Sequence, residues 1–188
     1  MNAQRFRDLH AGSTLLVLPN AWDAASAAVV QHAGASAVAT TSAGVAWSCG
    51  WPDGDHLPPE EMLGAARRIA RAVDVPLTVD IEEGCHDDPS EVASLVSALV
   101  DAGVAGINIE DGTKDPDILA AKLRAIRAAL GSRDLYINAR TDVFLRGMAS
   151  GDAGVKEVLR RGALYREAGA DGLFVPGIKA LDEVRRVA

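Results

Sequence analysis

The sequence has few cysteines, few aromatic residues and no cluster of basic residues. Its formal net charge is −7 with scattered lysines and arginines, which excludes a basic surface for nucleic acid or an anionic membrane. No apolar run approaches the length of a membrane-spanning helix, and the first residues lack the apolar core of a signal peptide. Only Cys49 and Cys85 occur, so no disulfide framework is indicated and we expect a cytoplasmic protein.

A glycine-rich phosphate-binding loop is also missing after the first apolar segment, which argues against a dinucleotide-binding fold. What is present is a chain of 188 residues, 48% of them apolar, without a linker-like segment. Such a chain can bury a substantial core and does not have the composition of a disordered protein. We therefore expect residues 1–188 to form a single domain.

Three segments share one design and mark a weak internal repeat, at residues 32–42, 101–111 and 167–177. In each, an amphipathic helix ends at Ala-Gly, where glycine suits a left-handed cap position, and an apolar strand follows. Residues 15–21, 76–82 and 135–141 are also typical of buried strands. Helical patterns fill the gaps, and the pattern at 88–103 begins with the capping residue Asp88 and a proline.

The alternation of these patterns predicts the fold class. About six strand-then-helix units follow one another, which favours an α/β protein with a parallel sheet covered by helices. The commonest closed form is the (β/α)8 barrel of the TIM type. Because the sequence stops after the sixth unit, we expect the C-terminal units of the barrel to be missing and its edge strands to be open. Open edges favour association into a homo-oligomer, and they leave a non-enzymatic alternative, a metal-binding, ligand-binding or interaction module.

Polar residues recur at the C-terminal ends of three successive predicted strands. Because side chains alternate along a strand, each pair lies on the inner side, opposite apolar residues that face the helices. The pairs are Asp80 and Glu82, Asn108 and Glu110, and Asn138 and Arg140. Barrel enzymes carry their chemistry at this end of the strands, so the shared phase favours a functional site. The alternatives are solvated strand ends or a buried salt-bridge network around Arg140.

Carboxylates crowded at one end of a sheet repel one another, and a divalent cation relieves this repulsion. Because few histidines or thiols accompany Asp80, Glu82 and Glu110, we expect Mg²⁺ or Mn²⁺ rather than zinc. Arg140 would bind a carboxylate or phosphonate of the substrate, or else it would act as a counter-ion to the acids. A cation beside an arginine suits a small 2-oxo acid whose enolate it stabilises.

Six segments, in this order, resemble the isocitrate lyase/phosphoenolpyruvate mutase superfamily over nearly the whole chain. They are LPNAWDAASA, TTSAGVAWSCGWPDG, LTVDIEEG, INIEDG, INARTD and GADGLFVPG. Each motif alone is weak, but the ordered set is specific. The resemblance implies a (β/α)8 barrel, Mg²⁺, and the making or breaking of C–C or P–C bonds in 2-oxo acids through an enolpyruvate-like intermediate.

The resemblance also implies roles for particular residues. Asp80 matches the main metal-binding aspartate, and Glu82 and Glu110 match further carboxylates that often act through waters. Arg140 matches the arginine that holds the substrate, and Asp53 matches an aspartate near the reaction centre. Thr41, Ser42, Ala43 and Gly44 match a loop of small residues whose backbone amides bind the substrate's carboxylate.

The sequence departs from the superfamily's pattern at several places. The lyases carry a Lys-Lys-Cys-Gly-His or Lys-Arg-Cys-Gly-His stretch after the fourth strand, where this chain has DGTKDPDILA and no cysteine. The same segment lacks the long gate of the mutases. We therefore expect the shorter branch of the superfamily and a lyase-like enzyme without the lyases' cysteine loop. Phosphonopyruvate mutase or hydrolase chemistry is the alternative.

Cys85 and His86 are adjacent to the acidic segment and suggest a second kind of site. A cysteine and a histidine beside carboxylates could bind zinc or form a nucleophilic pair. Neighbours in sequence rarely point at one another on a loop, however, and four ligands at zinc spacing are missing. We favour an ordinary loop residue followed by a solvated histidine.

Overall fold

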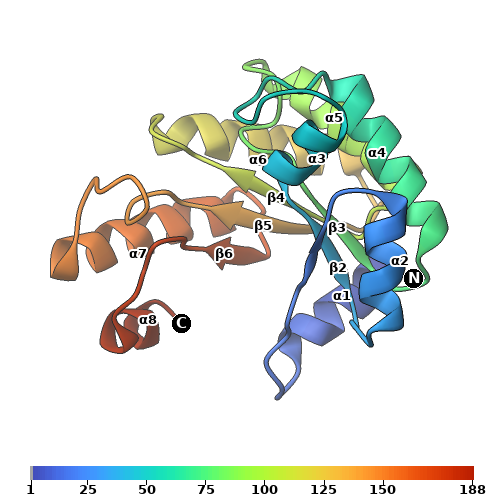
Figure 1. The fold of residues 1–188 in the computed structure, drawn as a ribbon. Helices are drawn as coiled ribbons and strands as arrows, with labels where there is room; N and C mark the ends of the chain where they lie inside the picture. The colour runs from blue at the N-terminus through green and yellow to red at the C-terminus, as the bar shows by residue number, and fades with distance from the viewer. Residues whose placement is uncertain (1) are drawn as a thin grey trace.

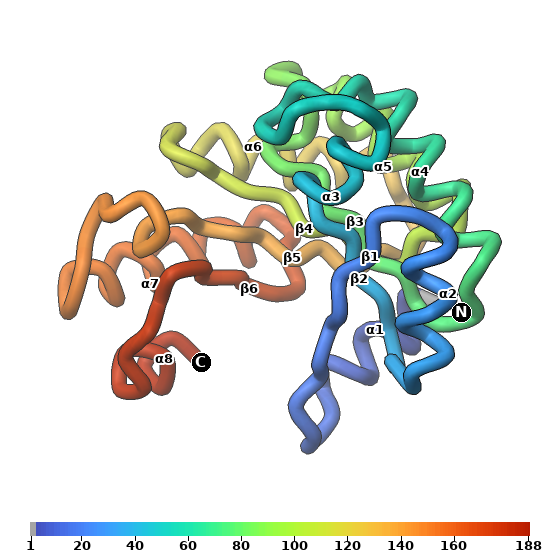
Figure 2. Tube along the Cα trace, in the orientation of Figure 1, coloured from blue at the N-terminus to red at the C-terminus, as the bar shows by residue number. Residues whose placement is uncertain are grey.

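The computed structural model describes residues 2–188 as six parallel strands and the helices that cover them (Figure 1). The strands are β1 (Asn20–Ala21), β2 (Val38–Thr40), β3 (Leu77–Asp80), β4 (Gly106–Glu110), β5 (Tyr136–Arg140) and β6 (Gly172–Phe174). They lie in one sheet in sequence order, each parallel to its neighbour. This order confirms the predicted α/β class and its strand-then-helix units. Figure 2 shows β1 and β6 at the two edges of the curved sheet.

The helices are α1 (Asn2–Ala11), α2 (Ala24–His32), α3 (Ser42–Ser48), α4 (Pro59–Ala72), α5 (Pro89–Asp101), α6 (Pro116–Leu130), α7 (Gly151–Glu167) and α8 (Leu181–Val187). Consecutive helices from α4 to α7 pack against one another. The side chain of Asp88 accepts a hydrogen bond from the amide of Ser90 at 2.7 Å, which confirms it as the cap of α5. None of the helices formed by residues 2–188 is long and apolar enough to cross a membrane.

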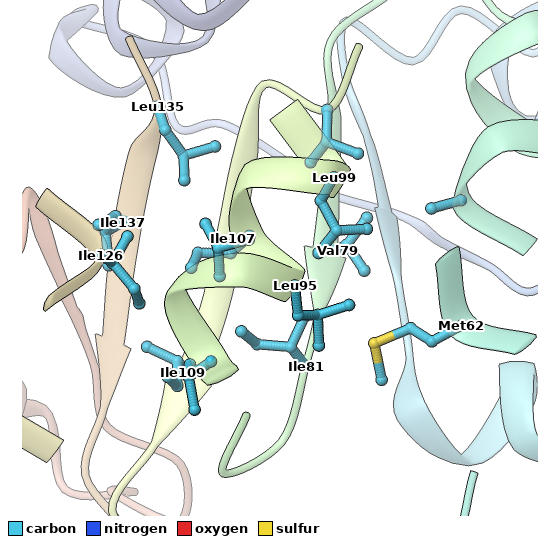
Figure 3. Packing of buried hydrophobic residues seen from close by; sticks show 14 of the residues in the cluster. Met62, Val79, Ile81, Leu95, Leu99, Ile107, Ile109, Ile126, Leu135 and Ile137 are labelled. Carbon is cyan, nitrogen blue, oxygen red and sulfur yellow. The ribbon is translucent and has the colours of Figure 1, made fainter. Parts of the chain in front are cut away.

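The core lies between the sheet and the helices (Figure 3). Val79, Ile107 and Ile137 point from β3, β4 and β5 toward this layer, where Leu99 of α5 and Ile126 of α6 meet them. All five side chains are buried. The predicted alternation is therefore confirmed on these strands, because the intervening polar residues lie on the opposite, inner side.

One predicted strand is much shorter than expected. Residues 15–21 are typical of a buried strand, but only Asn20 and Ala21 pair with β2. Leu15 and Val17 are 88% and 71% exposed, so the expected burial of this segment was wrong. The physical reason is that β1 is an edge strand with one partner among residues 2–188, and apolar periodicity cannot report whether a second layer covers it.

Helix α1 covers the amino ends of β4 and β5, which the sequence alone did not predict. Phe6 is buried and meets the ring of Tyr136 edge-on at 5.4 Å, and His10 stacks on Tyr136 at 4.3 Å. Gly106 allows this approach, because a Cβ there would lie 2.8 Å from Cε1 of Phe6. The interior of the curved sheet is therefore closed by aromatic rings below and bordered by strand ends above.

Candidate active site at the carboxyl ends of the strands

A pocket of about 470 Å³ lies inside the curved sheet. It reaches from Phe6 and His10 of α1 to the carboxyl ends of the strands. Around those ends it is lined by Thr40, Thr41, Asp80, Asn108, Asn138, Arg140 and Phe174. Four of the polar inner residues predicted from strand alternation thus line one concave space, while Glu82 and Glu110 lie beside it.

Asp80 is the carboxylate that lines this pocket. Asp80, Asn108 and Asn138 are partners in the registers of β3, β4 and β5. Their side chains form a ladder, in which Asn138 Nδ2 donates to Asn108 Oδ1 at 3.2 Å and Asn108 Nδ2 donates to Asp80 Oδ1 at 3.4 Å. Asp80 Oδ2 also accepts from the amide of Ser42 at 3.2 Å. These long hydrogen bonds orient the carboxylate and leave it lone pairs for a ligand.

Glu82 reaches the site differently from the prediction. Strand β3 ends at Asp80, and the amide of Gly84 donates to the carbonyl of Ile81 at 2.8 Å, so the chain turns and Glu82 has φ 51°. Strand alternation was therefore the wrong basis for its position. Glu82 Oε2 accepts from the amide of Asp55 at 2.6 Å. Burial, together with the charges of Asp55, Asp53 and Asp80, raises the pKa of Glu82 to about 7 despite this hydrogen bond.

Arg140 lies between two carboxylates at the end of β5. Its Nη1 is 2.7 Å from Glu110 Oε2, while its Nε and Nη2 donate to Asp142 at 2.7 and 3.2 Å. The side chains of Arg140 and Glu110 are 17% and 11% exposed. Burial lowers the pKa of the guanidinium, but the hydrogen bonds of Asp142 and the charge of Glu110 more than offset this, so the pKa is raised. The counter-ion contact that the sequence left as an alternative is thus present.

Glu110 keeps a high proton affinity in spite of its arginine partner. Burial raises its pKa to about 7, and the charges of Asp142, Asp80 and Glu82 add to this, while Arg140 acts in the opposite direction. The negative charges therefore outnumber the cation that faces them. Each terminal nitrogen of Arg140 has a second N–H beyond the one that these carboxylates take.

The segment Thr41–Gly44 was expected to be a loop, and it is the start of a helix. Thr41 is the residue before α3, and Ser42 begins the helix. A Cβ on Gly44 would lie 2.9 Å from Cγ2 of Thr41 and 3.1 Å from Cβ of Trp22, so the small residue is required by close packing. Asp53 lies on the exposed segment after α3, where its charge acts on Glu82.

The oxygen donors of the site suit a divalent cation that is held largely by water. Within residues 2–188, no three His, Cys, Asp or Glu side chains form a ready-made metal cluster. Mg²⁺, however, keeps several waters and takes only one or two protein carboxylates. Asp80 in the pocket, with Glu82 and Glu110 close enough for mutual repulsion, fits a cation held by one carboxylate and by waters.

The thiol of Cys85 is not activated. Burial raises its pKa to about 12, and the charges of Asp55 and Glu82 act in the same direction. A nucleophilic or zinc-binding cysteine needs the thiolate, which these neighbours disfavour. Cys85 has φ 61° and belongs to the turn after β3, which agrees with the interpretation as a loop residue.

Asp142 and Asp111 lie next to the site, and the sequence did not single them out. Both stood within the quoted motifs INARTD and INIEDG. Asp142 lies two residues after Arg140, and such spacing places both side chains on one side of an extended chain, so the signal was present. Asp111 carried no comparable signal, because its partners come from α7, far away in the sequence.

The fold and the pocket define a class, namely parallel α/β proteins of the barrel type with an acidic site and an arginine at the carboxyl ends of the strands. Within it, the family model of phosphoenolpyruvate phosphomutase matches residues 6–188, and the chain belongs to this family. The resemblance to the phosphoenolpyruvate mutase/isocitrate lyase superfamily is thereby confirmed.

Three similar proteins illustrate the family. An uncharacterized protein of Mycobacterium tuberculosis is 39% identical over 95% of this chain and 67% of its own length. The 2-methylisocitrate lyase of Bacillus subtilis is 32% identical over 99% of this chain and 63% of its own length. The structure of phosphonopyruvate hydrolase in complex with oxalate and Mg²⁺ superposes with a TM-score of 0.86 at 26% identity, covering 100% of this chain and 67% of that one. The chain thus spans about two thirds of each of these proteins.

Proposed function

We propose that the protein is a Mg²⁺-dependent enzyme that makes or breaks a C–C or P–C bond in a small 2-oxo acid. The observation that carries this proposal is that Asp80 and Arg140 line one pocket at the carboxyl ends of the strands, with Glu82 and Glu110 close enough to interact with them. A similar protein with oxalate and Mg²⁺ bound supports it, because oxalate has the shape and charge of the enolate of a 2-oxo acid.

The residues of the site are proposed to bind either the metal or the substrate. Asp80 would hold Mg²⁺ directly, and Glu82 and Glu110 would hold its waters. When bound, Mg²⁺ supplies a Lewis acid for the oxo oxygen of the substrate. Arg140 would offer the free N–H groups of its terminal nitrogens to a carboxylate or phosphonate. The amides of the segment Thr41–Gly44 would bind the second anionic group.

Asp53 is proposed to act near the reaction centre as a catalytic residue. The segment that carries Asp53 contacts the site through the hydrogen bond that the amide of Asp55 donates to Glu82. An exposed aspartate on such a segment can exchange protons with water and with a substrate that is bound in the neighbouring pocket.

Two kinds of bond cleavage are candidates. Strand β4 passes to α6 through residues 111–115, which contain no cysteine. A lyase-like reaction without the cysteine acid is the first candidate. Phosphonopyruvate mutase or hydrolase chemistry is the second candidate. The likeness to 2-methylisocitrate lyase supports the first candidate, and the likeness to phosphonopyruvate hydrolase supports the second.

A turnover screen tests the proposal. Oxaloacetate, phosphonopyruvate, 2-methylisocitrate and 2,3-dimethylmalate would be incubated with the protein, with and without Mg²⁺, and Asp80→Asn would serve as the inactive control. We expect Mg²⁺-dependent turnover of at least one acid. Tight Mg²⁺-dependent binding of oxalate without any turnover would point instead to a ligand-binding module. The absence of both turnover and oxalate binding would contradict the proposal.

A further inference from the structure

A buried polar network lies behind the site, on the side of α7. The carboxylate of Asp111, just after β4, is 2% exposed as a residue and accepts four hydrogen bonds. Its Oδ2 accepts from Thr141 Oγ1 at 2.8 Å, from Arg161 Nη1 at 2.7 Å and from Tyr165 Oη at 2.5 Å. Its Oδ1 accepts from the backbone amide of Asp142 at 3.0 Å. The proposed chemistry uses none of these groups.

This network ends on the arginine of the site. Asp142 is fully buried, and its backbone is fixed by Asp111. Its carboxylate accepts from two nitrogens of Arg140 and, at 3.3 Å, from Nε of the exposed Arg146. Two bonds along one edge of a planar guanidinium fix both its position and the direction of its plane.

The arrangement exceeds what charge neutralisation requires. Glu110 already supplies Arg140 with a carboxylate at 2.7 Å, and a second buried carboxylate costs desolvation free energy. Asp142 therefore adds orientation rather than a missing charge. It bonds the Nε edge, which leaves the free N–H groups of the two terminal nitrogens on the remaining sides of the guanidinium.

We propose that Asp142 is a positioning residue. Anchored through Asp111 to Arg161 and Tyr165 of α7, it aims the guanidinium of Arg140 into the pocket toward the anionic group of the substrate. This inference rests on the proposed function, in which Arg140 binds a carboxylate or phosphonate.

A double-mutant cycle tests the proposal, with oxalate as the probe in the presence of Mg²⁺ and calorimetry as the measurement. Asp142→Asn removes the charge and one acceptor while keeping the shape. We expect it to weaken oxalate binding by about tenfold or more in the wild-type background, and by less than about twofold in Arg140→Lys, which has already lost the Nε–H. Equal losses of affinity in the two backgrounds would overturn the proposal, since a merely structural role does not act through Arg140.

Two further variants serve as a control and as a substitute for Asp142→Asn. Arg146→Gln is the matched control, because it removes the exposed cation that contacts the same carboxylate, and we expect oxalate affinity within about twofold of wild type. Tyr165→Phe removes one donor from Asp111 without changing a charge, so it serves if Asp142→Asn does not fold. It should weaken oxalate binding modestly and, again, only when Arg140 is present. An unchanged affinity in Tyr165→Phe together with unfolding of Asp142→Asn would reject the proposal.

A measurement without ligand separates this proposal from the proposed function. In ¹⁵N-labelled protein, the Nε–H of Arg140 should exchange slowly with water because it is bonded to Asp142. The Nε–H should exchange faster in Asp142→Asn, which keeps only one, uncharged acceptor, and at the wild-type rate in Arg146→Gln. If wild-type protein does not bind oxalate with Mg²⁺, the proposed function fails, and this exchange rate alone decides whether Asp142 holds Arg140. An exchange rate that is unchanged in Asp142→Asn would refute the positioning role.

Discussion

At the residue scale, the behaviour of the site depends on how its carboxylates are balanced by positive charge. Glu82 and Glu110 both have a pKa raised to about 7, mainly by burial and then by neighbouring carboxylates. Arg140 is the cation that faces Glu110, and Asp142 shares it. A bound divalent cation would lower both pKa values, because it stabilises the ionised carboxylates.

Asp80→Asn should abolish the binding of Mg²⁺ and leave the fold intact. The substitution keeps the shape and one acceptor oxygen for Asn108, but it removes the carboxylate that lies in the pocket and the acceptor for the amide of Ser42. The free energy of unfolding without metal should change by less than about 1 kcal/mol, since the fall in repulsion among the acids offsets the lost hydrogen bond. Calorimetric titration with Mg²⁺ checks this, and an unchanged affinity would contradict the assignment of Asp80 as the metal ligand.

Arg140→Lys should reduce oxalate affinity by about tenfold or more, because lysine keeps the charge and loses the fork. The side chain also bonds Asp142 along one edge, so the free energy of unfolding should fall by about 1–3 kcal/mol. Calorimetry and urea denaturation measure the two effects. Oxalate binding with wild-type affinity in the presence of Mg²⁺ would show that Arg140 is a counter-ion alone.

The raised pKa of Glu82 predicts a stability that depends on pH. Between its ordinary value near 4.5 and about 7, the folded protein binds more protons at Glu82 than the unfolded chain does. Stability therefore falls as pH rises through this window and levels off above it. Relative to Glu82→Gln, wild type should lose on the order of 1–3 kcal/mol between pH 5 and pH 8. Parallel stability profiles for the two proteins, measured without metal, would show that folding does not raise the pKa of Glu82.

At the scale of elements, the site exists because three neighbouring strands end in the same plane with the same phase. The register aligns Asp80 with Asn108 and Asn138, and it aligns Glu110 with Arg140. Helix α1 supports this arrangement from the opposite end, where Phe6 packs on Gly106 and Tyr136. The pocket depends on both ends, since α1 supplies its floor.

Gly106→Ala should loosen α1 from the sheet. The new Cβ would lie 2.8 Å from Cε1 of Phe6 and 3.1 Å from Oγ1 of Thr78, and neither neighbour can move freely in this packed layer. We expect the free energy of unfolding to fall by about 1–3 kcal/mol. Gly64→Ala in α4 is the matched control, because its Cβ would meet only the flexible end of Arg68 at 3.3 Å. The control should be neutral or stabilising by up to about 1 kcal/mol, and equal losses in both variants would contradict the role of α1.

At the scale of the whole molecule, the sheet formed by residues 2–188 has open edges at β1 and β6. Exposed apolar side chains lie next to them, with Leu15 and Val17 before β1 and Phe174 in β6. Unpaired strand edges beside apolar surface are sites of association. We therefore expect this 188-residue chain to self-associate at micromolar concentration.

Analytical ultracentrifugation checks the self-association. Leu15→Lys combined with Val17→Lys should shift the equilibrium toward monomer, because charge on an edge opposes strand pairing. Ile118→Lys is the control, since it adds a charge at an exposed position of α6, which packs between α5 and α7 rather than at an edge strand. A monomer with cooperative melting in the wild-type chain would show that its edges are closed in some other way.

The sequence by itself determined the local structure and most of the family's signature. The alternation of Ile107 and Ile109 with Asn108 and Glu110 predicted which side of β4 is buried, and the structure agrees. The cap at Asp88 and the left-handed glycines Gly103 and Gly169 also followed from the sequence. These features depend on neighbouring residues and on backbone periodicity, which a single chain displays directly.

Only the tertiary structure decided the features that depend on distant partners. Glu82 enters the site through a turn and the amide of Asp55 rather than through strand alternation. Arg140 is held by Asp142, and Asp142 by Asp111, whose partners lie on α7. Local periodicity cannot report which side chains a folded chain brings together, because those contacts are set by packing and hydrogen-bond geometry between elements that are far apart in sequence.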